Sequence, residues 1–243
     1  MRLTRVYVEE PLQSGTRCRI AGSAANHVRR VLRLGVGAAV TLFDGTGGEY
    51  AARLESVDKD SVVVEVGTHA AIERESPLHL TLAQGVSRGE RMDWVIQKAT
   101  ELGVRRILPL ITLRSVVRLD ARQAQRKLQH WRGISIATCE QCGRNRLPQI
   151  AAPRELGEFL TDEAAPATQR LVLARTGSAR IRELDRLDSI TLLVGPEGGL
   201  AQEEQSAAIG RGFLSVQLGP RVLRTETAAV AALAALQQAC GDF

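Results

Sequence analysis

Two glycine–proline turns near the C-terminus constrain the fold more than any other feature of the sequence. The first turn, residues 195–199, follows the short apolar run 190–194, and the second, residues 218–227, follows the apolar run 213–218. Each turn precedes a stretch with the composition of a helix. This strand–turn–helix order is the one in which α/β proteins bind ligands, at the carboxyl ends of parallel strands. Glycine lets the backbone approach a ligand closely and proline fixes its path, so both turns are candidate ligand-binding loops.

The hydrophobic pattern divides the chain into two parts. Residues 1–67 contain short runs that alternate between apolar and polar positions, and strands this short close naturally into a small β-barrel. Residues 68–77 are polar and end in Ser76 and Pro77, which disfavour a helix. Strands and helices alternate from residue 78 onwards, which predicts a mostly parallel sheet with helices on both faces. We therefore predict a β-rich domain over residues 1–72 and an α/β domain over residues 73–243.

The period of the apolar residues predicts the individual elements. In the first part, Ser23 is a candidate N-cap for a helix that ends at residue 34. The predicted strands of this part are residues 2–8, 38–43, 49–57 and 61–66. In the second part, the predicted strands are residues 78–84, 106–111, 171–174, 191–194 and 215–218, and the predicted helices are residues 89–102, 121–138, 203–209 and 227–239.

Composition limits the classes of protein to which the chain can belong. It shows no charged N-terminal region followed by an apolar run, and no apolar run near the ~20 residues of a membrane span, so we expect neither a secretory signal nor a membrane anchor. Cys139 and Cys142 form the one close cysteine pair, and neither a second such pair nor a spaced histidine pair accompanies them. We therefore expect reduced structural thiols, no metal site and a cytoplasmic location. The net charge of +5 is compatible with a polyanionic partner but does not establish one.

Further blocks of sequence occur in order along the chain, at residues 24–33, 74–78, 87–93, 96–103 and 139–146. Together with the two turns, they resemble the 16S ribosomal RNA uracil-N3 methyltransferases of the SPOUT superfamily. The resemblance implies a methyltransferase domain with a deep trefoil knot, preceded by a PUA-like barrel that binds RNA. It also implies S-adenosylmethionine as methyl donor, a homodimer, and 16S rRNA within the assembled small ribosomal subunit as substrate.

The resemblance implies that the two turns hold S-adenosylmethionine. The first turn lacks both the Gly-Lys-Ser/Thr ending of a phosphate loop and the spacing of a dinucleotide fingerprint, so ATP and NAD are disfavoured. Thr225 is also a candidate N-cap, with Glu226 near the positive end of the helix dipole, and this role alone would explain both residues. The residues expected to bind the cofactor are Leu173, Val194, Gly195, Pro196, Glu197, Gly198, Gly199, Leu218, Gly219, Leu223, Arg224, Thr225 and Thr227.

Methylation of uracil N3 requires loss of the weakly acidic N3 proton and alignment of the nitrogen with the methyl group. Our hypothesis is that Arg224 stabilises negative charge on the uracil carbonyl oxygens. Glu226 then orients Arg224 or accepts the proton, and Arg221 holds a phosphate or orients the turn. Arg175 follows a strand end where the family often carries histidine or glutamate, so whether it contacts cofactor or RNA stays open.

Clusters of basic residues are candidates for RNA contacts, because arginine binds phosphate in a bidentate manner. A solvated surface is the ordinary interpretation of each cluster taken alone. Two other functions are compatible with the sequence: a SPOUT methyltransferase for another RNA position, such as a ribose 2′-hydroxyl, or a non-enzymatic ribosome assembly factor. The candidate RNA-binding residues are Asn26, His27, Arg29, Arg30, Arg33, Arg88, Arg91, Lys98, Arg144 and Arg146.

Overall fold

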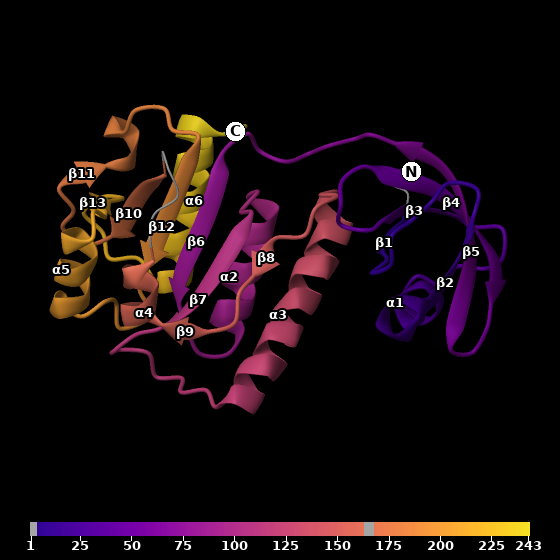
Figure 1. Ribbon diagram of the computed structural model, residues 1–243, viewed down its shortest axis with the longest axis horizontal. Helices are drawn as coiled ribbons and strands as arrows, with labels where there is room; N and C mark the ends of the chain where they lie inside the picture. Colours follow the sequence, from indigo (N-terminus) through magenta and orange to yellow (C-terminus); the bar gives the residue numbers. More distant parts are fainter. Residues whose placement is uncertain (1–3, 163–167) are drawn as a thin grey trace. The chain divides into compact units, whose positions relative to one another are not determined.

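The computed structural model describes residues 4–162 and 168–243 (Figure 1). It divides the chain into two compact units. The first unit comprises Met1–Glu75 together with Ile136–Leu147, and the second comprises Ser76–Ser135 together with Pro148–Phe243. The long helix α3, Ala121–Cys142, therefore contributes residues to both units.

The first unit is built on a five-stranded sheet in the order β1-β3-β4-β5-β2. The first two of these strands pair in parallel and the other pairs are antiparallel. In β2, buried and exposed residues alternate, as the period of a half-buried strand requires. The five strands are β1 (Thr4–Tyr7), β2 (Arg17–Ala21), β3 (Ala39–Phe43), β4 (Glu49–Val57) and β5 (Ser61–Ala70).

A short helical segment follows β2 in the first unit. It consists of α1, Gly22–Asn26, and a π-helical turn η1, His27–Val31. The helix predicted up to residue 34 is thus shorter than expected. It also begins one residue before Ser23, so that residue lies inside the helix and the predicted N-cap is wrong.

The second unit contains an eight-stranded sheet in which every pair is parallel, as the alternation of strands and helices predicted. Its order is β11-β13-β10-β12-β6-β7-β8, with β9 paired to β7. The strands are β6 (His79–Gly85), β7 (Arg106–Ile111), β8 (Gln149–Ile150), β9 (Arg154–Glu155), β10 (Gln169–Leu173), β11 (Ala179–Arg180), β12 (Ser189–Val194) and β13 (Leu214–Gln217).

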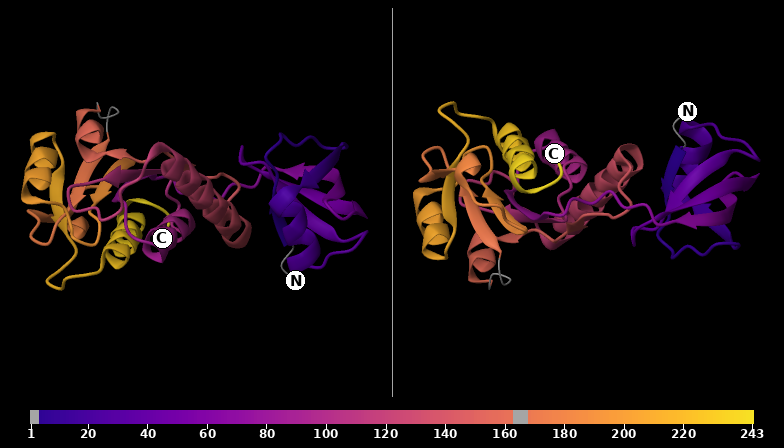
Figure 2. Two further views of the ribbon diagram at one scale, coloured as in Figure 1. Left: turned by 90° about the horizontal axis from the view of Figure 1, so that it is seen from below. Right: turned by 90° about the horizontal axis from the view of Figure 1, so that it is seen from above.

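Two apolar cores cover the two faces of this sheet. Figure 2 shows helices on both sides of it. Leu82 and Leu192 belong to the core of one face, and their chain neighbours Ala83 and Leu193 belong to the core of the other, as the two-residue period of a strand dictates. The predicted coverage by helices on both faces is therefore confirmed. The first core contains α2 (Glu90–Glu101) and α6 (Thr225–Cys240), and the second contains α4 (Leu156–Thr161) and α5 (Gln202–Gly210).

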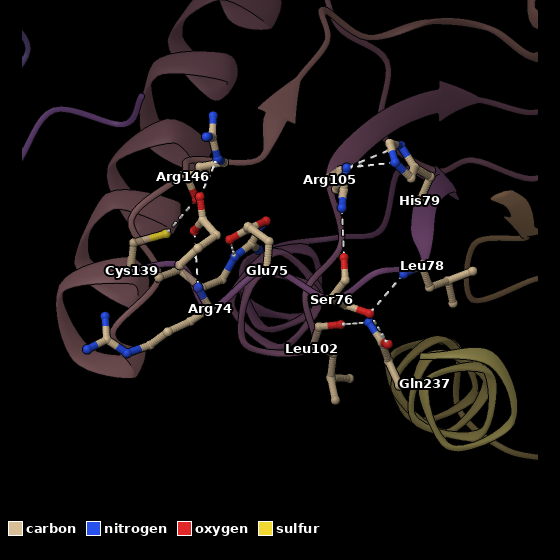
Figure 3. A network of polar contacts seen from close by, with 12 residues as sticks. Arg74, Glu75, Ser76, Leu78, His79, Leu102, Arg105, Cys139, Arg146 and Gln237 are labelled. Carbon is tan, nitrogen blue, oxygen red and sulfur yellow. Dashed lines mark hydrogen bonds and ion pairs between the residues drawn. The ribbon is translucent and has the colours of Figure 1, made fainter. Parts of the chain in front are cut away.

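Helix α6 is anchored by a buried glutamine at its far end (Figure 3). The Gln237 Oε1 atom accepts a hydrogen bond of 2.7 Å from the Ser76 hydroxyl, and its Nε2 atom donates one of 2.6 Å to the Leu102 carbonyl. Arg105 donates to the Ser76 carbonyl at 2.7 Å. These bonds fix the C-terminal helix beside the end of α2 and the start of β6. Within the described residues, no helix is both long and apolar enough to cross a membrane.

Candidate active site

Four neighbouring strands bring the two turns to one edge of the sheet. β13, β10, β12 and β6 are adjacent and parallel, so their carboxyl ends lie at the same edge. Leu173 ends β10, Val194 ends β12, and Leu218 directly follows β13. Three predicted cofactor residues from distant parts of the sequence thus meet at one edge of the sheet.

A buried glutamine joins the two turns. Gln84 lies opposite Val194 in the register of β6 and β12 and is fully buried. Its Nε2 atom donates to the Gly195 carbonyl in the first turn and to the Thr225 hydroxyl in the second, each at 3.2 Å. Thr225 in turn donates to the Gly195 carbonyl at 2.6 Å. The first turn and the start of α6 are therefore held as one assembly.

This bonding corrects the role predicted for Thr225. The N-cap of α6 is Arg224, which has an extended backbone and whose side chain makes no capping hydrogen bond. Thr225 is instead the first helical residue, and it is buried. Its hydroxyl therefore serves the contact with Gly195 rather than the helix terminus.

Tight backbone packing explains the glycines of the first turn. Gly199 has a φ of +66°, in the left-handed region that glycine adopts without strain. A Cβ atom on Gly195 would lie 2.6 Å from the Leu200 nitrogen, which is far too close for a side chain. The absence of a side chain at Gly195 and Gly199 thus lets the backbone of the first turn pack against itself.

Arg91 of α2 connects the acidic residues of both turns. Its Nη1 atom lies 3.0 Å from Glu197 Oε1, and its Nε atom lies 3.9 Å from Glu226 Oε1. Glu197 also accepts a hydrogen bond of 2.8 Å from the backbone nitrogen of Arg88. Burial alone would raise the pKa of Glu197, but these hydrogen bonds and the charge of Arg91 outweigh it and lower the pKa. Glu226 therefore pairs with Arg91, and the expected pairing of Glu226 with Arg224 is absent among the described residues.

Two buried oxygen atoms in this assembly have no hydrogen-bond donor within the described part of the chain. They are Gln84 Oε1 and Glu226 Oε2. Buried acceptors are normally satisfied, so a donor supplied by a ligand is a physical explanation for both. S-Adenosylmethionine carries amino and ammonium donors, so its chemistry fits an acceptor such as Gln84 Oε1.

The basic residues of the second turn lie at the surface. Arg221 and Arg224 are exposed, and neither forms an ion pair with any described residue. Leu223 and Thr227 are also exposed, and Arg175 is exposed after β10. The site thus combines a half-buried glutamate, Glu226, with exposed arginines of the second turn.

The candidate RNA-binding residues are in different environments. Arg144 does not fit an exposed phosphate contact: its side chain is 5% exposed and binds both oxygens of Glu75, at 2.8 and 2.6 Å. Arg146 is half exposed and pairs with Glu73 at 2.7 Å. The ion pair of Glu75 with Arg144 therefore joins two blocks that carried the resemblance, residues 74–78 and 139–146, and gives Arg144 a structural role.

The remaining candidates keep access to solvent. Asn26, Arg30, Arg33 and Arg88 are exposed, whereas His27 and Arg29 are half-buried. Lys98 pairs with Glu101 at 2.8 Å on the surface of α2. Their contact with RNA stays a prediction.

The close cysteine pair forms no disulfide, and the other two cysteines, Cys18 and Cys240, are also free. A hydrogen bond with Cys142 and burial both raise the pKa of the Cys139 thiol, so it stays protonated at neutral pH. Cys139 donates to the Arg146 carbonyl at 3.6 Å (Figure 3). Among the residues that the structure describes, no group of three or more potential ligands could hold a metal ion.

Comparisons with known proteins identify the family of the chain. Residues 74–237 match the family model of the RNA methyltransferase domain, and residues 20–67 match that of the RNA methyltransferase PUA domain. Ribosomal RNA small subunit methyltransferase E of Bacillus subtilis is 32% identical over 97% of this chain and 94% of its own length. The chain belongs to this methyltransferase family.

Two solved structures support the family assignment. A methyltransferase from Legionella pneumophila, in complex with bound SAM, is 42% identical, covers both chains fully and superposes with a TM-score of 0.96. Ribosomal RNA small subunit methyltransferase E from Neisseria gonorrhoeae, bound to S-adenosyl methionine, is 36% identical over both full chains, with a TM-score of 0.92. The α/β fold with its PUA domain is thus that of the methyltransferase family.

Sequence reasoning missed Gln84 and the pairing role of Arg91. Gln84 is the one polar side chain near the end of a buried apolar strand, and that position at the carboxyl edge was the available signal. Arg91 was grouped with the RNA contacts because it is basic and lies at the start of a helix. Its acidic partners lie over a hundred residues away in sequence, so no local pattern could reveal them.

Proposed function

We propose that the protein transfers a methyl group from S-adenosylmethionine to N3 of a uridine in 16S rRNA of the small ribosomal subunit. The observation that carries this proposal is the joined pair of turns, with two buried acceptors that lack donors. The methyltransferases with bound SAM at 42% and 36% identity support the cofactor, and the relatives named for the small subunit RNA support the substrate.

The cofactor site consists of the two turns and the end of β10. When bound, S-adenosylmethionine supplies an electrophilic methyl group on a sulfonium. Backbone groups of residues 194–199 and 218–225, with Leu173, would hold the adenosyl part. Gln84 and Thr225 fix the distance between the turns, so the cofactor would meet a preformed site.

Glu226 is our candidate for the group that accepts the N3 proton. Its Oε2 atom is a buried acceptor to which no described residue donates, and Arg91 pairs with the other oxygen. A positioned base contributes about 10²–10⁴-fold to a reaction that removes a proton. Arg224 is exposed and forms no ion pair with a described residue, and it would stabilise negative charge on the uracil carbonyl oxygens. Arg221 would hold a phosphate of the RNA.

Several broader features belong to the same proposal. The five-stranded sheet of the first unit would close as a PUA-like barrel that binds RNA, with domains at residues 1–72 and 73–243. The segment from β13 to α6 would pass through a trefoil knot, supported by the contact of Thr225 with Gly195. The protein would act in the cytoplasm as a homodimer on assembled subunits, and Trp94, 42% exposed on α2, is a candidate for the dimer contact.

Transfer of radiolabelled methyl groups to small-subunit RNA tests the proposal. With methyl-labelled S-adenosylmethionine and the protein present, we expect label in 16S rRNA and none in large-subunit RNA. Glu226→Gln should lower kcat by about 10²–10⁴-fold while the affinity for the cofactor is kept. Glu203→Gln is the matched control, because Glu203 is exposed at the start of α5. Unchanged turnover in Glu226→Gln would exclude that residue as the base, and absence of label with the native protein would refute the function.

A further inference from the structure

A line of arginines leads away from the first turn along the segment before α3 and the start of that helix. Arg114, Arg118, Arg122 and Arg126 follow one another at intervals of four residues, and all four are exposed. Figure 1 shows the coil after β7 leading into the first turn of α3. All four residues lie in the second unit, as does the candidate active site.

Helix geometry places Arg122 and Arg126 on the solvent side of α3. Residues four apart share a face, and these two are about 6 Å apart along the axis. The nine residues from Arg122 to Trp131 turn the helix about 2.5 times, which puts them on opposite faces. Trp131 is 1% exposed and belongs to the core of the sheet, so the two arginines point away from the core.

The positive charge of this line is not neutralised. Asp120 is the one acidic residue between positions 113 and 135. Its Oδ1 atom accepts a hydrogen bond of 2.7 Å from the Gln123 nitrogen, at the start of α3. Within residues 4–162 and 168–243, no acidic side chain forms an ion pair with Arg118, Arg122 or Arg126.

Arg114 connects this line to the candidate active site. Its Nη1 atom donates a hydrogen bond of 3.0 Å to the Gly198 carbonyl in the first turn. A Cβ atom on Gly198 would lie 3.1 Å from the Arg114 Cβ, so the two segments are in direct contact. The basic line therefore starts at the turn that would hold the methyl donor.

We propose that Arg118, Arg122 and Arg126, here called the α3 stripe, bind phosphates of the RNA substrate beside the target nucleotide. The inference rests on the proposed function, which supplies a polyanion at the adjoining site. Three exposed arginines without acidic partners are complementary to a strand of phosphates, and phosphate contacts hold the register of an RNA without reading its sequence. The stripe extends the predicted RNA contacts to a surface that the sequence motifs did not indicate.

Salt dependence of RNA binding tests the α3 stripe. The triple variant Arg118→Gln/Arg122→Gln/Arg126→Gln is compared with the native chain and with the control Arg182→Gln/Arg186→Gln/Arg211→Gln. The control arginines are exposed in the same unit and form no ion pair with described residues, so both variants lose three charges. Affinity for small-subunit RNA is measured from ~0.05 M to ~0.5 M KCl, together with affinity for S-adenosylmethionine.

We expect the stripe variant to reduce the slope of log affinity against log salt by about 2, and to weaken RNA binding about 100-fold near 0.1 M salt. Its KM for RNA should rise, whereas cofactor affinity and kcat at saturating RNA should stay at the native values. The control should keep the native slope.

Equal losses in the two variants would overturn the inference, because general charge would then explain the effect. A loss of binding to assembled subunits but not to naked RNA would also overturn it, in favour of an acidic protein partner. A native chain that binds no RNA and transfers no methyl group would instead refute the proposed function, which keeps the two failures distinct.

Discussion

Removing the charge of Glu75 should destabilise the protein strongly, because Glu75 is a buried, doubly hydrogen-bonded acidic partner of the buried Arg144. Glu75 and Arg144 are 7% and 5% exposed and form two hydrogen bonds of 2.6 and 2.8 Å. Burial lowers the pKa of Arg144, but the hydrogen bond and charge of Glu75 outweigh it and raise the pKa, so the guanidinium stays charged. Breaking a buried pair of this kind costs about 3–5 kcal/mol in the free energy of unfolding. Glu75→Gln keeps the shape of the side chain and removes the charge that Arg144 needs.

Thermal unfolding measures this loss directly. For a chain of this length, about 2–4 °C of Tm corresponds to 1 kcal/mol, so Glu75→Gln should lower Tm by about 6–20 °C. The matched control is Glu55→Gln, which breaks the pair of Glu55 with Arg17, whose side chains are 31% and 75% exposed. An exposed pair contributes about 0–1 kcal/mol, so the control should change Tm by no more than about 4 °C. Equal shifts in the two variants would refute the reasoning that burial makes the pair with Arg144 essential.

Three further predictions concern the site and the pH dependence. Thr225→Val removes one of the two side-chain donors to the Gly195 carbonyl, a loss that costs about 1–3 kcal/mol in stability. It should weaken S-adenosylmethionine binding measured by calorimetry, whereas Thr225→Ser, which keeps the hydroxyl, should retain native binding. Arg91→Gln removes the partner of Glu197 and Glu226, and should lower kcat by about 10–100-fold. The KM for RNA and the slope of log RNA affinity against log salt should stay unchanged, because a raised KM would instead indicate that Arg91 contacts a phosphate. Burial raises the pKa of the Glu140 carboxyl above the usual 4.5, so the folded state binds the carboxyl proton more tightly than the unfolded state does. Glu140 therefore reduces the free energy of unfolding as pH rises from about 4.5 through the raised pKa. Glu140→Gln should therefore raise Tm at pH 7 but not at pH values below about 4, and a Tm difference independent of pH would contradict this assignment.

The sequence predicted the parts of the fold that depend on local pattern. The apolar runs that became β6, β7, β10, β12 and β13 are long enough to be recognised in the sequence, and turns or helix patterns follow them. Strands β8, β9 and β11 have two residues each, too few for any period, and they form only because a neighbouring strand supplies their hydrogen bonds.

The sequence predicted the two turns of the candidate site but not the side-chain contacts between distant residues. The glycines and proline of residues 195–199 indicated a ligand-binding turn because their backbone requirements are local. Arg144 was expected on the surface because arginine usually is, yet Glu75, 69 positions away, makes its burial favourable. The same limit applies to Gln84, whose partners Gly195 and Thr225 are brought to it only by the parallel sheet.

Reverse transcription across 16S rRNA tests the central claim most directly, because methylation of uracil N3 blocks the pairing edge of the base. Small subunits that lack the modification are incubated with the protein, with and without S-adenosylmethionine. We predict a new stop at a single uridine that depends on both the protein and the cofactor. Methyl label in the RNA without a stop would contradict N3 methylation and indicate a position away from the pairing edge, such as a ribose hydroxyl. Neither label nor stop, with tight binding to the subunit, would contradict the enzymatic function itself.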